Sequence, residues 1–331
     1  MMEPASGDGS PYLTIVSTGR NDSYGGNFEE RFLRTLRFNT AQLAAREVAA
    51  EFVFVEWAAP AGRPLLSDLA REAVPGCSLT FRSYVVDAAY QEALTLNRRV
   101  AYLEFIAKNV GIRRARGEFI LTTNADVFLG RGVLDALARR ALGRGTVYRA
   151  RRIDLKLGID QTSLDWDVLE DARNYDGGLK PLKPPLYAGG TGDFVLADAA
   201  TFARLRGFNE VFRVAKIGID KNFLVKALDA GVPIVDIGSP VYHINHVGSY
   251  RASKAQYRGE AADAPYGDDR WPAGSVIYEN PDNWGLADAP MVPLRAGTWR
   301  LPFHWNAVPP LVDLDRVTVA GVAGGDEDGS A

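Results

Sequence analysis

The order of apolar segments along the chain restricts its fold more than any other feature of the sequence. Runs of apolar and β-branched residues with the composition of buried strands lie at 12–18, 51–57, 79–86 and 118–123. Between them, apolar residues recur at helical spacing, which predicts helices over 65–73 and 100–115 and an earlier one that begins near Phe28. Strands that alternate with helices in this way predict an α/β fold, a mostly parallel sheet flanked by helices.

The second half of the chain is less regular. The same patterns predict helices over 164–173, 199–205 and 219–230, and strands over 193–197, 232–237 and 240–246. A Gly- and Pro-rich stretch, 174–191, is expected to be a long loop, and residues after 249 are expected to form ordered loops. Near the start, Asn27 with Glu30 three residues later predicts a capping box at the first helix.

Composition narrows the class of protein. The 331 residues carry a formal net charge of −3 with both signs interspersed, which argues against a nucleic-acid partner because duplex binding needs a basic face. Cys77 is the one cysteine, so no intrachain disulfide can form, and a cytoplasmic location is expected. No apolar run is long enough to span a bilayer and residues 1–11 lack a signal-peptide pattern, which leaves peripheral membrane association and homo-oligomerisation open.

The polar residues after the predicted strands are the first candidates for a binding site. Ligands of open α/β sheets bind beyond the carboxyl ends of the strands, and Asn124-Ala125-Asp126 follows such a strand. Asp126 there suits Mg²⁺ or Mn²⁺, although an Asn/Asp turn is an ordinary structural alternative. His243 and His246 end a later strand, and they point to opposite faces unless that strand ends near Ile244. In that case one of them can turn toward the metal.

Residues 107–126 carry a more specific pattern. Asn109, Gly111, Ala115 and Gly117 precede an apolar run that ends in Asn124-Ala125-Asp126. This arrangement resembles GT-A glycosyltransferases, especially those similar to family 2, whose acid-x-acid motif would fall on 124–126 with Asn in its first position. Further segments agree in order with that resemblance, at 17–22, 55–57, 189–194, 206–210 and 217–220.

The resemblance implies a GT-A fold, with a Rossmann-like nucleotide-binding sheet and a smaller mixed region on the acceptor side. It implies a UDP- or GDP-sugar as donor, a glycan or other hydroxyl acceptor, and Mn²⁺ or Mg²⁺ held by Asp126 with His246 and His243. The residues that would contact the donor nucleotide are Thr18, Gly19, Arg20, Asp22, Glu56, Lys108, Asn109, Arg113, Asn124 and Ala125.

Two aspartates are candidates for the transfer step. In inverting family members an acidic residue at the place of Asp220 acts as the general base for the acceptor hydroxyl. Asp220 also opens a predicted helix, where Asp is a favoured N-cap, and the two roles are compatible. Asp193 follows a Gly-rich run and would bind the donor sugar or the acceptor; a turn aspartate is its alternative role.

These expectations divide the chain into five parts. They are a flexible leader, a nucleotide-sugar-binding half, an acceptor half that holds the catalytic residues, a loop-rich lid and a disordered tail, at 1–11, 12–130, 131–249, 250–318 and 319–331. Two other functions stay open. Asn124 and Ile219, which replace acidic residues, favour a non-catalytic nucleotide-sugar- or glycan-binding protein. A sugar-nucleotide pyrophosphorylase shares the layered plan, but its basic Gly-rich loop is poorly matched here.

Overall fold

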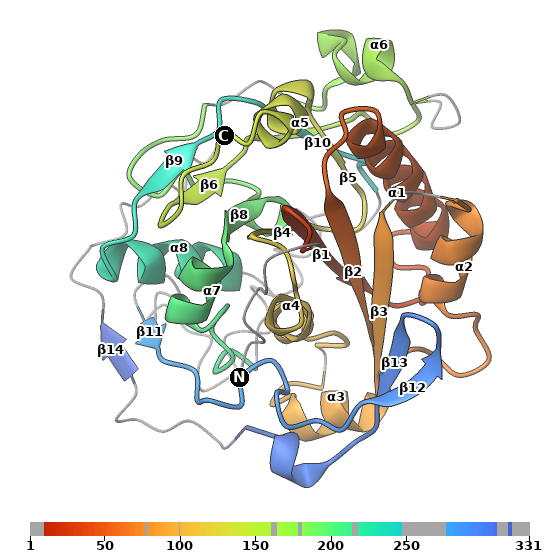
Figure 1. The fold of residues 1–331 in the computed structure, drawn as a ribbon, viewed down its shortest axis with the longest axis vertical. Coiled ribbons are helices and arrows are strands. Elements are labelled where there is room, and N and C mark those ends of the chain that lie inside the picture. Colours follow the sequence, from red (N-terminus) through yellow and green to blue (C-terminus); the bar gives the residue numbers. More distant parts are fainter. Residues whose placement is uncertain are drawn as a thin grey trace.

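The computed structural model describes residues 10–76, 79–98, 100–159, 164–177, 181–213, 218–246, 276–309 and 317–319. Its main sheet has nine strands (Figure 1). In spatial order they are β12 (Val292–Arg295), β13 (Thr298–Leu301), β3 (Thr80–Val86), β2 (Ala50–Trp57), β1 (Leu13–Gly19), β4 (Phe119–Thr122), β8 (Val195–Asp198), β6 (Val147–Arg149) and β9 (Ile234–Asp236).

Most strand pairs in this sheet are parallel. The pairs β13–β3, β3–β2, β2–β1, β1–β4 and β6–β9 are parallel, whereas β8 is antiparallel to both neighbours and β12 is antiparallel to β13. The chain runs outward from β1 through β2 to β3 and then returns to the other side of β1 as β4. The predicted α/β fold with a mostly parallel sheet is therefore confirmed.

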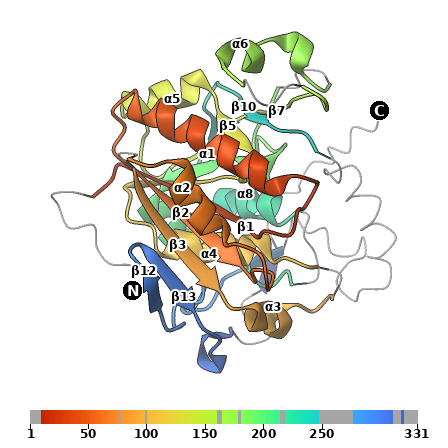
Figure 2. The ribbon, with the colours of Figure 1, turned by 90° about the vertical axis from the view of Figure 1, so that its right-hand side faces the viewer.

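Helices cover both faces of the sheet. Apolar residues that alternate along the strands divide between two cores, so that Ile15 and Phe52 contribute to one and Val16 and Val53 to the other. The first core includes residues of α1 (Phe28–Ala44), α2 (Leu66–Ala73) and α5 (Arg131–Ala138), and the second includes residues of α3 (Ala88–Leu94), α4 (Glu104–Arg113), α7 (Ala199–Leu205) and α8 (Ile219–Asp229). Figure 2 shows α1 and α2 side by side over one face.

Two smaller sheets complete the described structure. One has the order β5 (Val127–Leu129), β10 (Val241–His243) and β7 (Arg152–Asp154); the other pairs β11 (Val276–Tyr278) with β14 (Val317–Val319). In the three-stranded sheet, His243 is the register partner of Val127 on one side and of Asp154 on the other. This register brings the end of β10 beside the segment that links β4 to β5.

The structure corrects several local predictions. Asn27 has a left-handed backbone (φ 49°) and its side chain caps no helix N–H, so the predicted capping box is wrong; that bond needs an extended residue at the cap. The helix expected over 100–115 begins only at Glu104. The helix expected over 164–173 is reduced to α6 (Trp166–Leu169) and a separate 3₁₀ turn, Ala172–Asn174.

The C-terminal part also departs from expectation. The loops expected after 249 include the hairpin of β12 and β13, which extends the main sheet beside β3, and the β11–β14 pair. The expected leader (1–11), except for its last two residues, lies outside the described residues, as do residues 250–275 and 310–316 of the expected lid and all but Val319 of the expected tail. Among the described residues, no helix has the length and apolar character needed to cross a membrane.

Candidate metal centre

Asp126 lies where the strand order of the main sheet reverses. It follows β4 and directly precedes β5, at the carboxyl end of the parallel strands β1 and β4. Because β2 and β4 lie on opposite sides of β1, the connections that leave these strands diverge there, and open α/β sheets bind their ligands at such a point. The segment 18–22 comprises the last two residues of β1 and the three residues after it, at the same edge.

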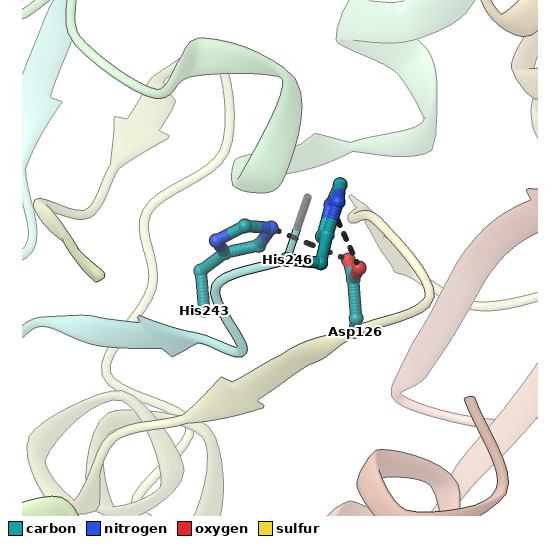
Figure 3. A group of neighbouring side chains, drawn as sticks. All are labelled: Asp126, His243 and His246. Atoms are coloured by element: carbon teal, nitrogen blue, oxygen red, sulfur yellow. Dashed lines mark ion pairs between the residues drawn. The ribbon is translucent and has the colours of Figure 1, made fainter. Parts of the chain in front are cut away.

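Two histidines face the Asp126 carboxylate. His243 Nε2 lies 3.7 Å from Asp126 Oδ1, and His246 Nε2 lies 3.6 Å from Asp126 Oδ2 (Figure 3). One ligand atom from each residue falls within 4.8 Å of the others, and all three residues are buried. The 3.7 and 3.6 Å separations from Asp126 are too long for hydrogen bonds, but they fit ligands that share one ion at bonds of about 2.0–2.2 Å. The residues present therefore fit a divalent cation.

The end of strand β10 explains how both histidines reach Asp126. β10 ends at His243, and the backbone N–H of Ile244 donates a hydrogen bond of 3.1 Å to the Asp126 carbonyl. The alternation of a strand no longer applies beyond that point, so His246 is free to turn to the same side as His243. The structure thus brings together all three residues that the sequence suggested as metal ligands.

Asp154 lies behind His243. The Nδ1 atom of His243 is 2.7 Å from Asp154 Oδ1, so its other ring nitrogen faces Asp126. The second carboxylate oxygen of Asp154 accepts from Arg152 Nη2 at 3.1 Å. Sequence analysis did not single out Asp154 or Arg152, because only the pairing of β7 with β10 places them at the site.

His246 is held by a different segment, the turn before α1. The ring of Tyr24 meets the ring of His246 edge-on with centroids 5.3 Å apart, and a Cβ at Gly25 (φ 67°) would overlap His246 Nδ1. Arg31 stabilises this turn, because it donates hydrogen bonds to the carbonyls of Tyr24 (2.8 Å), Gly25 (3.4 Å) and Gly26. The same guanidinium donates from Nε to Asp126 Oδ2 at 3.2 Å. Arg31 is a third site residue, after Asp154 and Arg152, that the sequence did not reveal.

The charges around Asp126 keep it ionised. Burial acts to raise the pKa of its carboxyl, but His243, His246 and Arg31 together outweigh burial and lower that pKa. For His243, burial acts to lower the imidazole pKa, while the charge of Asp126 and the hydrogen bond to Asp154 raise it. An ionised carboxylate is the form that binds metal, whereas His243 must lose its proton to do so.

Asn124 and Asp193 are joined beside this group. Asn124 Nδ2 donates to Asp193 Oδ1 at 2.7 Å, and Asn124 Oδ1 accepts from Lys108 Nζ at 2.7 Å. Lys108 also donates to the Gly192 carbonyl at 2.8 Å and to Glu104 at 2.8 Å. The other oxygen of Asp193 accepts from Arg152 Nη1 at 2.8 Å. A continuous polar network therefore runs from Lys108 through Asp193 and Arg152 to the metal group.

Asp220 lies in the first turn of α8. The N-cap position belongs to Gly218 (φ 89°), so Asp220 is not the N-cap residue that the sequence allowed. Its Oδ2 accepts from the Gly192 N–H at 2.8 Å, and Lys108 also contacts Gly192. Burial raises the pKa of the Asp220 carboxyl despite the opposing charges of Lys108 and Arg149. A carboxylate with a raised pKa is suited to accept a proton.

The end of β1 and the residues after it are held by hydrogen bonds to other segments. Thr18 Oγ1 donates to the Val55 carbonyl at 2.8 Å and accepts from the hydroxyl of Tyr102. Arg20 donates to the Ala101 carbonyl at 2.9 Å and pairs with Asp22 at 3.0 Å. Gly19 leaves no room for a side chain, because a Cβ there would lie 2.8 Å from the Phe28 ring.

The remaining predicted nucleotide contacts have partners within the fold. Ala125 is buried, and its carbonyl accepts from Thr35 Oγ1. Glu56 accepts hydrogen bonds from the N–H groups of Leu66 (2.8 Å) and Ser67 (3.2 Å) at the start of α2.

Asn109 and Arg113 both lie on α4. Asn109 Nδ2 donates hydrogen bonds to the Phe208 carbonyl at 2.8 Å and to the Glu210 carboxylate at 2.9 Å. Asn109 Oδ1 accepts from the Phe208 N–H at 2.8 Å. Arg113 lies over the ring of Trp284, 5.0 Å from its centroid.

Comparison with known proteins found likenesses only among solved structures. No family model matches this chain, and no curated protein does. GalNAc-T7 with UDP, GalNAc and Mn²⁺ aligns with a TM-score of 0.48 and 13% identity over 78% of this chain and 53% of that one, so this chain spans about half of it. The mannosyltransferase PcManGT from Pyrobaculum calidifontis, in complex with GDP-Man and Mn²⁺, aligns with a TM-score of 0.44 and 16% identity. This alignment covers 80% of this chain and 68% of that one.

A third structure is similar to a lesser degree. The catalytic domain of Drosophila beta1,4galactosyltransferase 7, in complex with xylobiose, aligns with a TM-score of 0.40 and 12% identity over 89% of this chain and 96% of that one. All three of these structures are of glycosyltransferases, but each TM-score is below 0.5, so the resemblance to GT-A glycosyltransferases, and to family 2 in particular, stays a prediction. At these scores the likenesses do not define the donor, the acceptor or the reaction.

Proposed function

We propose that this protein is a metal-dependent glycosyltransferase, which moves a sugar from a UDP- or GDP-sugar to a hydroxyl of a glycan or other acceptor. One observation carries the proposal: Asp126, His243 and His246 converge at the carboxyl edge of a parallel sheet. Asp193 lies in the network beside them and Asp220 contacts the adjoining loop at Gly192, so a metal group and two candidate carboxylates surround one region.

The donor atoms favour Mn²⁺ over Mg²⁺. Mg²⁺ prefers oxygen ligands and keeps much of its water, whereas imidazole nitrogen suits transition metals better. His243 and His246 supply two such nitrogens against one carboxylate from Asp126. When bound, the cation would neutralise the donor diphosphate and stabilise the leaving nucleotide.

The other residues would orient the two substrates. We assign Asp220 as the general base, which takes the proton of the acceptor hydroxyl as its oxygen attacks the anomeric carbon with inversion. Asp193, whose two oxygens are already oriented by Asn124 and Arg152, is assigned to a hydroxyl of the donor sugar or acceptor. Residues 18–22, at the carboxyl end of β1 and directly after it, are assigned to the nucleotide.

One observation favours a second candidate, a non-catalytic nucleotide-sugar-binding protein. Asn124 replaces an acidic residue, and both atoms of its amide are hydrogen-bonded within the protein, to Lys108 and Asp193. Under this alternative the site would bind donor and metal without transferring the sugar.

The first test is thermal stability against nucleoside diphosphates and nucleotide sugars, with and without Mn²⁺. A ligand present at about 100 times its Kd stabilises the native state by about 2.7 kcal/mol, which raises the melting temperature. The proposal expects a Mn²⁺-dependent shift with one nucleotide family. Absence of a shift with every donor would remove the basis of the proposal.

The second test separates transfer from binding. Asp220→Asn should lower kcat by about 10²–10⁴-fold and leave donor affinity within about twofold, because the amide can still accept from Gly192 but cannot take a proton. Asp229→Asn, at the exposed far end of the same helix, is the matched control and should leave kcat unchanged. Donor binding without turnover in the wild-type protein would favour the non-catalytic alternative.

The pH profile adds an independent check of the base. A base must be deprotonated to act, so a raised pKa of Asp220 moves the acid limb of kcat/KM above the ordinary range for an aspartate. As the pH falls through that raised pKa, the wild-type rate should decline. An acid limb of the same shape in the residual activity of Asp220→Asn would assign it to another group.

A further inference from the structure

We infer that Asp154 is a positioning residue for the metal centre: it holds the His243 ring so that Nε2 presents its lone pair toward Asp126. The inference rests on the proposed metal site and goes beyond it, since Asp154 is not itself among the three proposed ligands. It follows from the contact of Asp154 with His243, from the strand register that creates this contact, and from the restraint on Asp154 by Arg152.

The contact fixes both the direction and the tautomer of the imidazole. Asp154 Oδ1 is 2.7 Å from His243 Nδ1, within hydrogen-bonding distance. A carboxylate can only accept, so a neutral His243 must carry its proton on Nδ1. Its Nε2 is then unprotonated and lies 3.7 Å from Asp126 Oδ1, where an ion would accept its lone pair.

The strand pairing of the backbone brings Asp154 next to His243. Asp154 and His243 are register partners in the parallel pairing of β7 with β10, so they lie side by side at the ends of two bonded strands. The Leu155 N–H donates to the His243 carbonyl at 2.9 Å and continues this pairing. The strand pairing therefore keeps the two side chains next to each other.

Arg152 restrains the carboxylate in turn. Its planar guanidinium donates through Nη2 to Asp154 Oδ2 at 3.1 Å and through Nη1 to Asp193 Oδ2 at 2.8 Å. The side chains of Arg152 and Asp154 are 23% and 29% exposed, so both are partly shielded from solvent. Arg152 thus bridges two carboxylates, and because it bonds Oδ2 of Asp154, the other oxygen, Oδ1, is the one that faces His243.

The expected effect is on metal affinity. Removal of a carboxylate that orients a metal-bound histidine weakens metal binding by about 10–100-fold, and Asp154→Ala should do so for Mn²⁺. Asp154→Asn should cost less, because the amide oxygen can still accept from Nδ1. Asp87→Ala is the matched control: Asp87 is 25% exposed and pairs with Arg300 in the same manner, away from the metal group.

Two measurements decide the inference. Calorimetric titration of each variant with Mn²⁺ gives the affinity, and ¹⁵N NMR of the metal-free protein, at a pH where the imidazole is neutral, gives the His243 tautomer. We expect an Nδ1-protonated ring in the wild type, loss of that preference in Asp154→Ala, and an affinity order of wild type, Asp154→Asn, Asp154→Ala. Asp87→Ala should match the wild type in both.

The outcomes distinguish this inference from the proposed metal site. If the wild type binds no Mn²⁺, the metal site is wrong and the inference fails with it. If the wild type binds Mn²⁺ but Asp154→Ala binds within twofold of it, or if the wild-type ring is protonated on Nε2, the inference alone is overturned. A lower unfolding midpoint in Asp154→Ala with unchanged Mn²⁺ affinity would likewise reduce Asp154 to a structural role.

Discussion

Glu56 and Asp126 are both buried carboxylates that lie near the carboxyl ends of parallel strands, with exposed fractions of 0% and 5%. Their partners differ. Glu56 accepts from Leu66 N–H, Ser67 N–H and Ser67 Oγ, all at the start of α2. Asp126 faces Arg31 and two imidazoles that are too far away to donate hydrogen bonds. Glu56 is thus bonded to its own fold, whereas Asp126 converges with other potential ligands.

The same difference governs their ionisation. Burial raises the pKa of Glu56, because its hydrogen bonds from α2 do not compensate for lost hydration. The cationic groups around Asp126 lower its pKa in spite of equal burial. A carboxylate at the edge of a sheet is therefore a candidate ligand only where other ligand atoms meet it, and burial alone does not identify one.

The largest effect that separates the two carboxylates is expected from Asp126→Asn. Loss of a ligand should weaken Mn²⁺ binding by more than the roughly 100-fold upper range for supporting residues. Glu56→Gln should leave Mn²⁺ affinity within about twofold. Calorimetric titration with Mn²⁺ measures both, and equal losses in the two variants would contradict the distinction between these sites.

A smaller effect on Mn²⁺ binding is expected from substituting Gly25, which packs against His246 but is not itself a proposed ligand. Gly25 and Gly26 both have positive φ, 67° and 73°, so alanine strains the backbone at either position by about 1 kcal/mol. Only at Gly25 would the added Cβ overlap His246, since Gly26 has nothing within 4 Å. Gly25→Ala should therefore weaken Mn²⁺ binding by about 10-fold, as loss of ligand support does, and Gly26→Ala should not.

Because the two glycine variants share the backbone strain, their difference reports on His246 alone. Both should lower the unfolding midpoint, as followed by circular dichroism. Equal Mn²⁺ affinities for Gly25→Ala and Gly26→Ala would show that the position of His246 is not set by this turn.

For Glu56 the expected effect is on stability. Glu56→Gln places an amide N–H₂ where the carboxylate accepted, which leaves a buried donor of α2 unsatisfied and costs about 1–3 kcal/mol of unfolding free energy. Urea unfolding measures this loss. If stability is unchanged and donor-nucleotide affinity falls instead, Glu56 contacts the nucleotide, as the sequence predicts.

The smallest expected effect is the pH dependence of stability at the same residue. Because the folded-state pKa of Glu56 is raised, the native state retains this proton after the unfolded state has lost it. Wild-type stability should therefore fall as the pH rises from the ordinary glutamate pKa through the raised folded pKa. The difference in unfolding free energy between wild type and Glu56→Gln should change across that window; a constant difference would contradict the raised pKa.

Much of the central sheet could be predicted from sequence. The strands β1 to β4 coincide closely with the apolar runs, because buried parallel strands leave few positions for polar residues. The β12–β13 hairpin could not be predicted. Pro293 interrupts a short run whose side chains are exposed, and the hydroxyls of Ser83 and Thr298, at the edge it covers, meet across 215 residues. Periodicity within a segment carries no information about such a pairing.

The candidate site likewise has residues that could be predicted from the sequence and residues that could not. Asp126 was singled out by its place after a predicted strand, and the resemblance added His243 and His246 as metal ligands. The end of β10 explains why both histidines face one carboxylate. Asp154 and Arg31 could not be predicted, because the place of each at the site depends on tertiary contacts. Asp154 is placed by the pairing of β7 with β10, and Arg31 by its hydrogen bonds to the turn before α1. Neither lies in a segment that the resemblance covers by motif.

The place of β13 beside β3 has a consequence for biosynthesis. A ribosome emits β3 early and must add some two hundred further residues before its edge partner appears, as the 215-residue separation of Ser83 and Thr298 implies. During that interval the nascent chain presents unpaired backbone groups along β3, a template on which neighbouring chains can assemble. A chain that ends before this hairpin would therefore leave β3 as an edge strand of the main sheet.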